Sequence, residues 1–182
     1  MKLLCFGDSN TYGFDPRDLL GGRYDACHRW PDILARDTGW EVLNEGVNGR
    51  QIPWNPYALR LLTAQAPVDM FLVMLGTNDL LQGASAAEAA ARMEHFLTRL
   101  LPCPCRILLI APPTMCRGAW VGSDELVVES RRLAGELAIL ARKLNIPYVD
   151  TSDWNIPLAF DGVHFTEDGH RMFAARLKVH LL

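Results

Sequence analysis

The sequence predicts an α/β fold, a three-layer αβα sandwich in which helices cover both faces of a mainly five-stranded parallel sheet. The first observation is a series of short apolar runs bounded by Gly, Pro or Asp, which predicts strands. The second is that these runs are apolar without alternation, as is typical of parallel strands covered on both faces. The third is that segments with helical spacing separate the runs, because each parallel crossover must pass over a face of the sheet.

Each predicted strand is rich in β-branched or large aliphatic residues. The first run follows Met1 directly, and the last is only three residues long. In chain order the runs are Lys2–Phe6, Glu41–Leu43, Val68–Leu75, Arg106–Ala111 and Pro147–Val149. We expect all of them to pair in parallel within one sheet.

Helices are predicted where apolar side chains recur every three or four residues. The predicted helices are Trp30–Thr38, Ala84–Leu101, Glu125–Leu144 and a last one opened by Thr166-Glu167-Asp168 that runs through Leu181. The stretch from Tyr12 to Arg29 is the longest irregular segment. Long loops in compact domains are commonly functional.

The composition indicates one domain, residues 1–182, because 49% of the residues are apolar and no low-complexity linker or internal repeat interrupts the chain. The 18 Lys and Arg nearly balance the 21 Asp and Glu, without a basic run. This pattern argues against a nucleic-acid partner and favours a small neutral substrate. The sequence leaves room for a homo-oligomer.

The first apolar run is too short for a signal peptide, and no apolar stretch reaches the roughly 20 residues of a membrane helix. We therefore expect a cytoplasmic protein with no membrane partner. The five cysteines are an odd number without a CxxC pair, which indicates neither a disulfide framework nor a zinc site. Cys103-Pro104-Cys105 is interpreted as packing before a buried strand, and we expect no metal and no cofactor.

Polar clusters follow the predicted strands and precede the last helix. They are Gly7-Asp8-Ser9-Asn10-Thr11, Glu45-Gly46-Val47-Asn48-Gly49, Gly76-Thr77-Asn78-Asp79 and Asp161-Gly162-Val163-His164-Phe165-Thr166. Because ligand crevices of parallel sheets lie at the carboxyl ends of the strands, we expect the clusters to meet at one edge.

These clusters contain every group that acyl transfer requires. Ser9 is the candidate nucleophile, His164 can accept its proton near neutral pH, and Asp161 can hold the far side of the imidazole ring. The N–H of Ser9, the N–H of Gly49 and the side-chain amide of Asn78 are candidate donors for an oxyanion. The sequence thus predicts a serine hydrolase site.

The four clusters resemble, in order and spacing, the conserved blocks of the SGNH (GDSL) hydrolase family. The matching segments are Phe6-Gly7-Asp8-Ser9, Asn44-Glu45-Gly46-Val47-Asn48-Gly49, Gly76-Thr77-Asn78-Asp79 and Asp161-Gly162-Val163-His164. Within the family, the run from Gly7 to Gly13 with the later His28-Arg29-Trp30 is similar to a bacterial branch of arylesterases and acyltransferases. Asn10 stands where the name-giving motif has Leu.

The resemblance implies a flavodoxin-like sheet and metal-independent hydrolysis of small carboxylic esters through an acyl-enzyme, with broad specificity for small acyl groups. It assigns Ser9, His164 and Asp161 to the catalytic triad, and Gly49 and Asn78, beside the N–H of Ser9, to the oxyanion hole. Acyl transfer to alcohols is compatible with the same residues.

Other functions remain open at this stage. A carbohydrate O-deacetylase, a lysophospholipase and an acyl-CoA thioesterase could all use this triad. A non-enzymatic, flavodoxin-like binding module would explain the alternating strands and helices. However, the sequence has no GxGxxG motif, and Phe14-Asp15 follows Gly13 where a phosphate loop would have Lys-Ser or Lys-Thr.

Aromatic residues near the expected carboxyl edge are candidates for a substrate pocket. Tyr12, Trp54 and Trp154 are the selected residues, and Phe14 and Trp120 lie in similar loops. Two neighbouring carboxyl groups are expected to be structural. Asp8 should accept local backbone N–H groups, and Asp79 should cap the turn that follows it.

Overall fold

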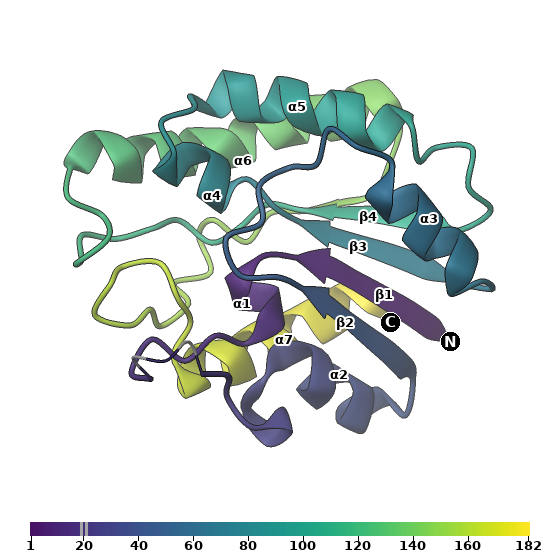
Figure 1. Ribbon diagram of the computed structural model, residues 1–182, viewed down its shortest axis with the longest axis horizontal. Helices are drawn as coiled ribbons and strands as arrows, with labels where there is room; N and C mark the ends of the chain where they lie inside the picture. Colours follow the sequence, from purple (N-terminus) through teal and green to yellow (C-terminus); the bar gives the residue numbers. More distant parts are fainter. Residues whose placement is uncertain (19, 21) are drawn as a thin grey trace.

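The computed structural model describes residues 1–18, 20 and 22–182, and its parallel sheet confirms the predicted fold class. Five strands in this part of the chain form one sheet in the order β2-β1-β3-β4-β5, and every neighbouring pair is parallel (Figure 1). The strands are β1 (Lys2–Gly7), β2 (Glu41–Gly46), β3 (Met70–Met74), β4 (Arg106–Ile110) and β5 (Tyr148–Val149). The chain reverses its direction of travel across the sheet between β1 and β3, which is where such sheets bind ligands.

Helices cover both faces of the sheet. On one face lie α2 (Trp30–Thr38) and α7 (Glu167–Leu181) (Figure 1). The opposite face carries α3 (Tyr57–Ala64), α4 (Thr77–Leu81), α5 (Ala86–Thr98) and α6 (Asp124–Leu144). Two short helices, α1 (Ser9–Tyr12) and the 3₁₀ helix η1 (Ala26–His28), follow β1.

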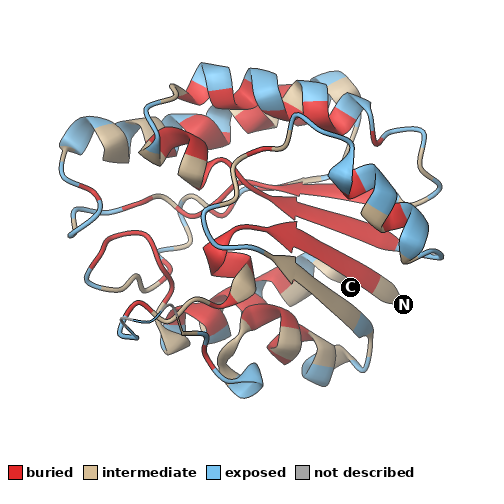
Figure 2. Ribbon diagram, in the orientation of Figure 1, coloured by how far each residue is buried: buried red, intermediate tan, exposed pale blue. Residues whose placement is uncertain are grey.

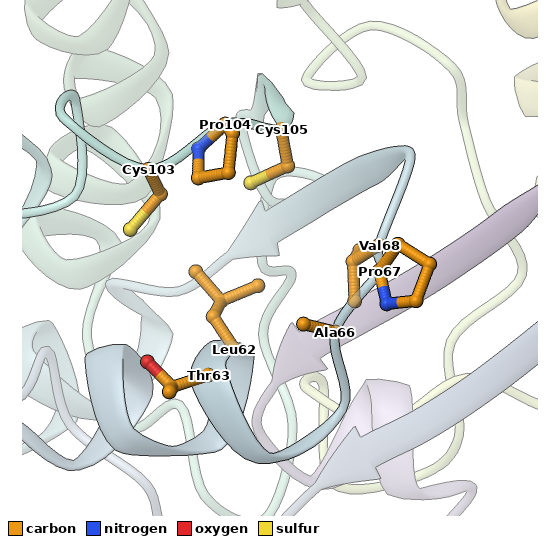
Figure 3. Close-up of a pocket in the computed structure, with 8 residues that line it drawn as sticks. All are labelled: Leu62, Thr63, Ala66, Pro67, Val68, Cys103, Pro104 and Cys105. Atoms are coloured by element: carbon orange, nitrogen blue, oxygen red, sulfur yellow. The ribbon is translucent and has the colours of Figure 1, made fainter.

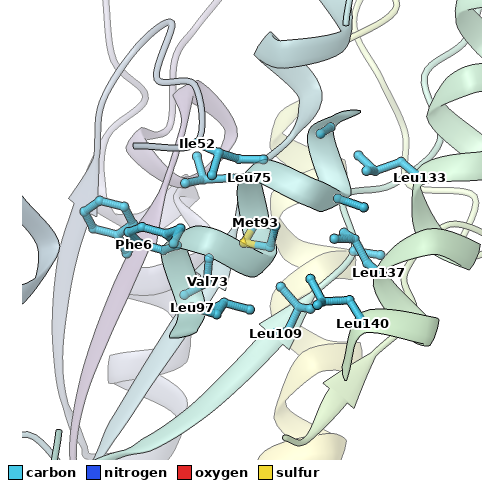
Figure 4. Close-up of a cluster of buried hydrophobic side chains, with 14 of the residues drawn as sticks. Phe6, Ile52, Val73, Leu75, Met93, Leu97, Leu109, Leu133, Leu137 and Leu140 are labelled. Carbon is cyan, nitrogen blue, oxygen red and sulfur yellow. The ribbon is translucent and has the colours of Figure 1, made fainter. Parts of the chain in front are cut away.

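Side-chain alternation along β1 builds a separate apolar core on each face of the sheet. Leu4 and Phe6 point toward α5 and α6, whereas Leu3 and Cys5 point toward α2 and α7. Figure 4 shows the first core, in which Phe6 and strand residues pack against leucines of α6 and Met93 of α5. Since β1 and β3 are buried on both faces, their runs lack polar alternation (Figure 2).

The strand after α2 differs from its prediction. We expected Glu41–Leu43 to be covered on both faces, but β2 is an edge strand that is mostly half-buried and continues to Gly46. Its polar residues remain in the strand because they pair with β1, with Asn44 opposite Cys5 and Glu45 opposite Phe6. Backbone pairing therefore outweighs the polar side chains at this edge.

Local capping explains where the long helices begin. Ser85 and Glu88 form a capping box, in which each side chain accepts a hydrogen bond from the other residue's backbone N–H, so α5 starts at Ala86. Thr166 caps α7 by accepting the N–H of Gly169 at 3.0 Å. The helix α3 was not predicted from the sequence, because its short apolar pattern lies between proline-rich segments.

In its described part, the segment between α1 and α2 is held by specific hydrogen bonds. Phe14 and Arg23 form an isolated antiparallel bridge, and the Arg23 side chain donates to the carbonyl of Tyr12 at 2.6 Å. Trp30, at the start of α2, is buried, and its indole N–H donates to the carbonyl of Asn10 at 3.0 Å. These contacts attach α2 to the turn that carries Ser9.

None of the helices in the described part of the chain combines the length and apolarity needed to cross a bilayer. The five cysteines are free thiols in the structure.

His170 is a fully buried histidine on α7, enclosed by aromatic rings. Its ring packs edge-on against Tyr24 and Phe165, and its Nδ1 accepts the backbone N–H of Trp30 at 3.4 Å. Burial, together with the positive charges of Arg29, His164 and His28, lowers the pKa of His170 to about 3. The folded protein therefore holds this ring neutral.

We predict that His170 makes the fold sensitive to acid. Because the pKa of His170 is lower in the folded than in the unfolded protein, this residue makes the free energy of unfolding depend on pH. Its contribution to stability is complete above the unfolded pKa of about 6.5 and is lost as the pH falls toward about 3. Between pH 7.5 and pH 5 the loss from this group should be about 2 kcal/mol. In urea unfolding, the His170→Asn variant should lose less free energy of unfolding over this pH range than the wild type. The His180→Asn variant, which changes an exposed histidine, should lose as much as the wild type. An equal change in the free energy of unfolding between pH 7.5 and pH 5 for all three proteins would show that His170 is not the acid-sensitive group.

Candidate active site

Three polar side chains form a continuous hydrogen-bonded chain at the carboxyl edge of the sheet. Ser9 is the first residue of α1, two residues past the end of β1, and Asp161 and His164 lie in the loop before α7. The Oγ of Ser9 is 2.9 Å from Nε2 of His164, and Nδ1 of His164 is 2.6 Å from Oδ2 of Asp161. All three residues are at most 5% exposed. The structure thus brings together residues that are more than 150 positions apart in the chain.

Asp161 also shapes the turn that presents the histidine. Its Oδ1 accepts the backbone N–H groups of Val163 and His164, both at 2.9 Å. Burial opposes ionisation of Asp161, but the hydrogen bonds from the ring and backbone of His164 and from Val163 outweigh it and hold the pKa below its usual value. An ionised Asp161 favours a proton on Nδ1 of His164, which leaves Nε2 free to accept the proton of Ser9.

Asn10 fastens the histidine loop to the turn that carries Ser9. Its Nδ2 donates to the carbonyl of Val163 at 3.0 Å, and its Oδ1 accepts the N–H of Phe165 at 2.9 Å. The two bonds therefore flank His164 on both sides. A leucine at this position, as in the GDSL motif, could make neither bond. The sequence predicts no role for Asn10, because only its departure from the motif is visible at that level.

The three candidate oxyanion donors come from the ends of three neighbouring strands. The Ser9 N–H opens α1, where helix N–H groups point outward and favour negative charge. Gly49 is exposed after β2, with a positive φ of 71° that glycine adopts without strain. Asn78 lies in the first turn of α4 after β3, and its Nδ2 donates one hydrogen to the carbonyl of Arg50 at 3.2 Å. Its second amide hydrogen remains available to a ligand.

Arg50 connects the segments that hold these donors, and sequence reasoning missed it. Its side chain donates to the carbonyls of Gly7, at 3.0 Å, and Glu45, and its guanidinium lies 4.1 Å from the ring centre of Phe6. Its own carbonyl orients Asn78. An arginine in a polar loop carries no sequence signal that separates this role from a solvated surface charge.

The two aspartates expected to be structural differ in their roles. Asp8 accepts the N–H of Asn10 at 3.0 Å, and burial raises its pKa to about 6 although that bond and the charges of His164 and Arg50 lower it. We predicted that Asp79 caps the turn that follows it, but its side chain does not bind that turn. Its carboxylate is fully buried and accepts the N–H of Ile52 at 3.0 Å and a hydrogen bond from Arg92 at 2.9 Å. It thus ties the segment after Gly49 to α5.

The aromatic candidates are dispersed, and two that were not selected lie against the histidine. Phe14 lies with its ring centre 4.6 Å from that of His164, and Trp120 meets the same ring edge-on at 4.8 Å. The selected residues lie elsewhere. Tyr12 packs under Arg23 at 4.4 Å, Trp54 is 82% exposed on a separate groove, and Trp154 packs against Phe173 and His180 over α7.

The Cys103-Pro104-Cys105 segment lines an apolar cavity of about 290 Å³ (Figure 3). The lining residues precede β3 and β4, so the cavity lies at the amino edge of the sheet, opposite Ser9. Burial, with the neighbouring Cys103 thiol, raises the pKa of Cys105, which disfavours the reactive thiolate. Within residues 1–18, 20 and 22–182, no three His, Cys, Asp or Glu side chains gather into a metal-ligand group.

A sequence profile described as the GDSL-like lipase/acylhydrolase family matches residues 5–172, nearly the whole chain. The chain belongs to this family. The resemblance inferred from the four polar clusters is therefore confirmed, and this chain is a hydrolase of carboxylic esters.

Solved structures of esterases have the same fold. The aryl esterase of M. smegmatis is 25% identical, with a TM-score of 0.87 over 99% of this chain and 97% of that one. A carbohydrate acetylesterase family member from Sinorhizobium meliloti is 27% identical, with a TM-score of 0.86 over 100% of this chain and 97% of that one. No curated protein matches the chain.

We predict that Asn10→Leu destabilises the fold. The substitution leaves the carbonyl of Val163 and the N–H of Phe165 buried without partners, and each such group costs roughly 1–3 kcal/mol. The free energy of unfolding, measured with urea, should fall by about 2–4 kcal/mol. Asn55→Leu removes one exposed side-chain bond to Tyr57 and serves as the control, with a loss of about 1 kcal/mol or less. Equal losses for the two variants would show that Asn10 does not fasten the histidine loop.

Proposed function

We propose that the protein is a serine esterase that hydrolyses small carboxylic esters through an acyl-enzyme. Ser9 is the nucleophile, His164 is the general base and acid, and Asp161 holds the imidazole. The observation that carries the proposal is the unbroken chain from Ser9 Oγ to His164 and Asp161, with distances of 2.9 and 2.6 Å. Such a chain is the arrangement that activates a serine hydroxyl.

The first half-reaction acylates the serine. Ser9 Oγ attacks the carbonyl carbon of the ester while its proton passes to Nε2 of His164, and the carbonyl oxygen becomes an oxyanion. When the carbon–oxygen bond to the leaving alcohol breaks, that alcohol takes the proton back from Nε2. Asp161 stabilises the imidazolium between these two proton transfers, because its pKa is held low and it stays ionised.

The second half-reaction releases the acyl group. A water gives a proton to His164 and attacks the acyl carbon, and Ser9 then leaves with that proton. An alcohol in place of the water would form a new ester, so the same residues support acyl transfer. The balance between the two depends on which nucleophile the site admits.

The oxyanion would receive hydrogen bonds from the N–H groups of Ser9 and Gly49 and from the side chain of Asn78. The amino end of α1 adds a favourable partial positive charge. Arg50 supports this arrangement, since its side chain holds the carbonyl of Gly7 and its carbonyl holds Asn78.

Small acyl groups and flat apolar leaving groups fit the surroundings of His164 best. Phe14 and Trp120 lie on the imidazole ring, and Trp120 remains 53% exposed, so it can cover an aryl or short alkyl group. The likeness to an aryl esterase supports this choice. The likeness to a carbohydrate acetylesterase family member keeps O-deacetylation of carbohydrates as a second candidate, favoured by the groove beside Trp54.

We predict that Ser9 is the site of covalent catalysis. Ser9→Ala removes the hydroxyl at the start of a short helix without opening a large cavity, so p-nitrophenyl acetate turnover should vanish while circular dichroism is unchanged. A fluorophosphonate should label Ser9 in the wild type, as located by mass spectrometry. Ser152→Ala, outside the site, is the control and should keep both activity and labelling. Labelling of another residue, or turnover by a folded Ser9→Ala protein, would refute the mechanism.

We predict a separate signature for the oxyanion donor. Because Asn78 would bind charge that develops only in the transition state, Asn78→Ala should lower kcat by roughly 10²–10³-fold with little change in KM. Steady-state kinetics on p-nitrophenyl acetate measures both constants, and Asn55→Ala serves as the matched amide control. A change confined to KM would make Asn78 a residue that positions the substrate.

A further inference from the structure

The turn that carries Gly49 has little packing of its own. Val47, Asn48 and Gly49 are exposed after β2, and among the described residues no atom beyond the chain neighbours lies within 4 Å of the place that a Cβ on Gly49 would occupy. Backbone hydrogen bonds hold the ends of the turn. The Val47 N–H donates to the carbonyl of Gly7 at 3.1 Å, and the Arg50 N–H donates to the carbonyl of Val47 at 3.1 Å. The position of the Gly49 N–H therefore depends on what holds the residues on either side of it.

The side chain of Arg50 joins this turn to the end of the strand that precedes Ser9. Its Nη1 donates to the carbonyl of Gly7 at 3.0 Å. Gly7 ends β1, two residues before Ser9 (Figure 1). The Gly7 carbonyl thus accepts hydrogen bonds from both ends of the Gly49 turn, one from the Val47 N–H and one from the Arg50 guanidinium.

The same guanidinium is held by β2 and by two aromatic rings. It also donates to the carbonyl of Glu45 in β2, and its Cζ lies 4.1 Å from the ring centre of Phe6 and 6.0 Å from that of Tyr57 in α3. A planar guanidinium can stack on rings while its fork of N–H groups binds carbonyls, whereas an ammonium is a compact charge without this geometry. The position therefore requires the shape of arginine as well as its charge.

Arg50 also reaches the third candidate donor, through its backbone. Its carbonyl accepts one hydrogen of the Asn78 amide at 3.2 Å. Because Gly49 precedes Arg50 directly in the chain, a shift of the Arg50 backbone would move the Gly49 N–H and the acceptor of Asn78 together. One residue thus connects the turn before Ser9, the Gly49 turn and the side chain of Asn78.

We propose that Arg50 is the positioning residue of the oxyanion hole. The inference rests on the proposed esterase function and assigns to one side chain the alignment of donors from three loops. In this role Arg50 acts through Gly49 and Asn78 and gives no hydrogen bond to the oxyanion itself. Donors of this kind act only when they are held close to the place where charge develops, and a displacement of about 1 Å costs on the order of 10²-fold in rate.

The first experiment replaces the side chain by one of similar length without donors. Arg50→Met should lower kcat on p-nitrophenyl acetate by roughly 10²-fold with little change in KM, because misplaced donors weaken binding of the transition state only. Arg50→Lys should recover part of that loss, since it restores the charge but not the fork of N–H groups. Arg176→Met is the matched control and should keep kcat, because Arg176 also donates to a backbone carbonyl, that of Trp154, but lies on α7.

A double-variant cycle separates this role from a merely structural one. If Arg50 acts through the donors, part of its contribution is already lost in Asn78→Ala. Arg50→Met should then cost a smaller factor in kcat in that background than in the wild type. A folding defect alone would cost the same factor in both backgrounds. Urea unfolding gives the folded fraction of each variant, and if Arg50→Met does not fold, the cycle is run with Arg50→Lys.

Three results would overturn the role of Arg50. One is an unchanged kcat in Arg50→Met. Another is full recovery in Arg50→Lys, which would show that the charge alone is required. The third is an equal loss in the two backgrounds of the cycle. Turnover by folded Ser9→Ala would overturn the esterase mechanism as well, whereas an inactive Ser9→Ala beside a fully active Arg50→Met would overturn the role of Arg50 alone.

Discussion

Parallel pairing of strands that are buried on both faces is the constraint on which the rest of the structure depends. It forces each connection over a face of the sheet and brings the carboxyl ends of the strands to one edge. β1 and β3 are adjacent although β2 lies between them in the chain. Ser9 and Asn78, which follow these two strands, therefore lie at the switch point, and the loop after β5 delivers His164 to the same place.

Close backbone approach is the second requirement of this edge. A Cβ at Gly46 would lie 2.0 Å from the backbone nitrogen of Tyr12, so α1 can rest against the end of β2 only with glycine there. Gly49, three residues later, takes a positive φ of 71° in the turn that the Arg50 N–H closes on the carbonyl of Val47. Gly46 and Gly49 thus let the segment after β2 lie close to α1 at this edge of the sheet.

Buried and half-buried polar side chains then hold these loops together, mainly by hydrogen bonds to backbone groups. Asn10 binds both neighbours of His164, Arg50 binds Gly7 and Glu45, and Asp79 binds Ile52. Each would be costly to bury without a partner. Satisfying them fixes the geometry of the candidate site.

The sequence by itself determined the five strands and the four long helices, the parallel class of the sheet and the polar clusters that follow its strands. These properties are local, since burial periodicity and glycine-bounded turns are readable within a few residues. The sequence also predicted Ser9, His164 and Asp161 as one set, because their residue types match one chemistry, and the structure joins the three side chains by hydrogen bonds. Only the tertiary structure decided that Asn10 and Arg50 support the site, that Phe14 and Trp120 contact His164, and that Trp154 packs over α7. The direction of a loop side chain depends on partners as far as 155 positions away, and no local pattern encodes such a contact.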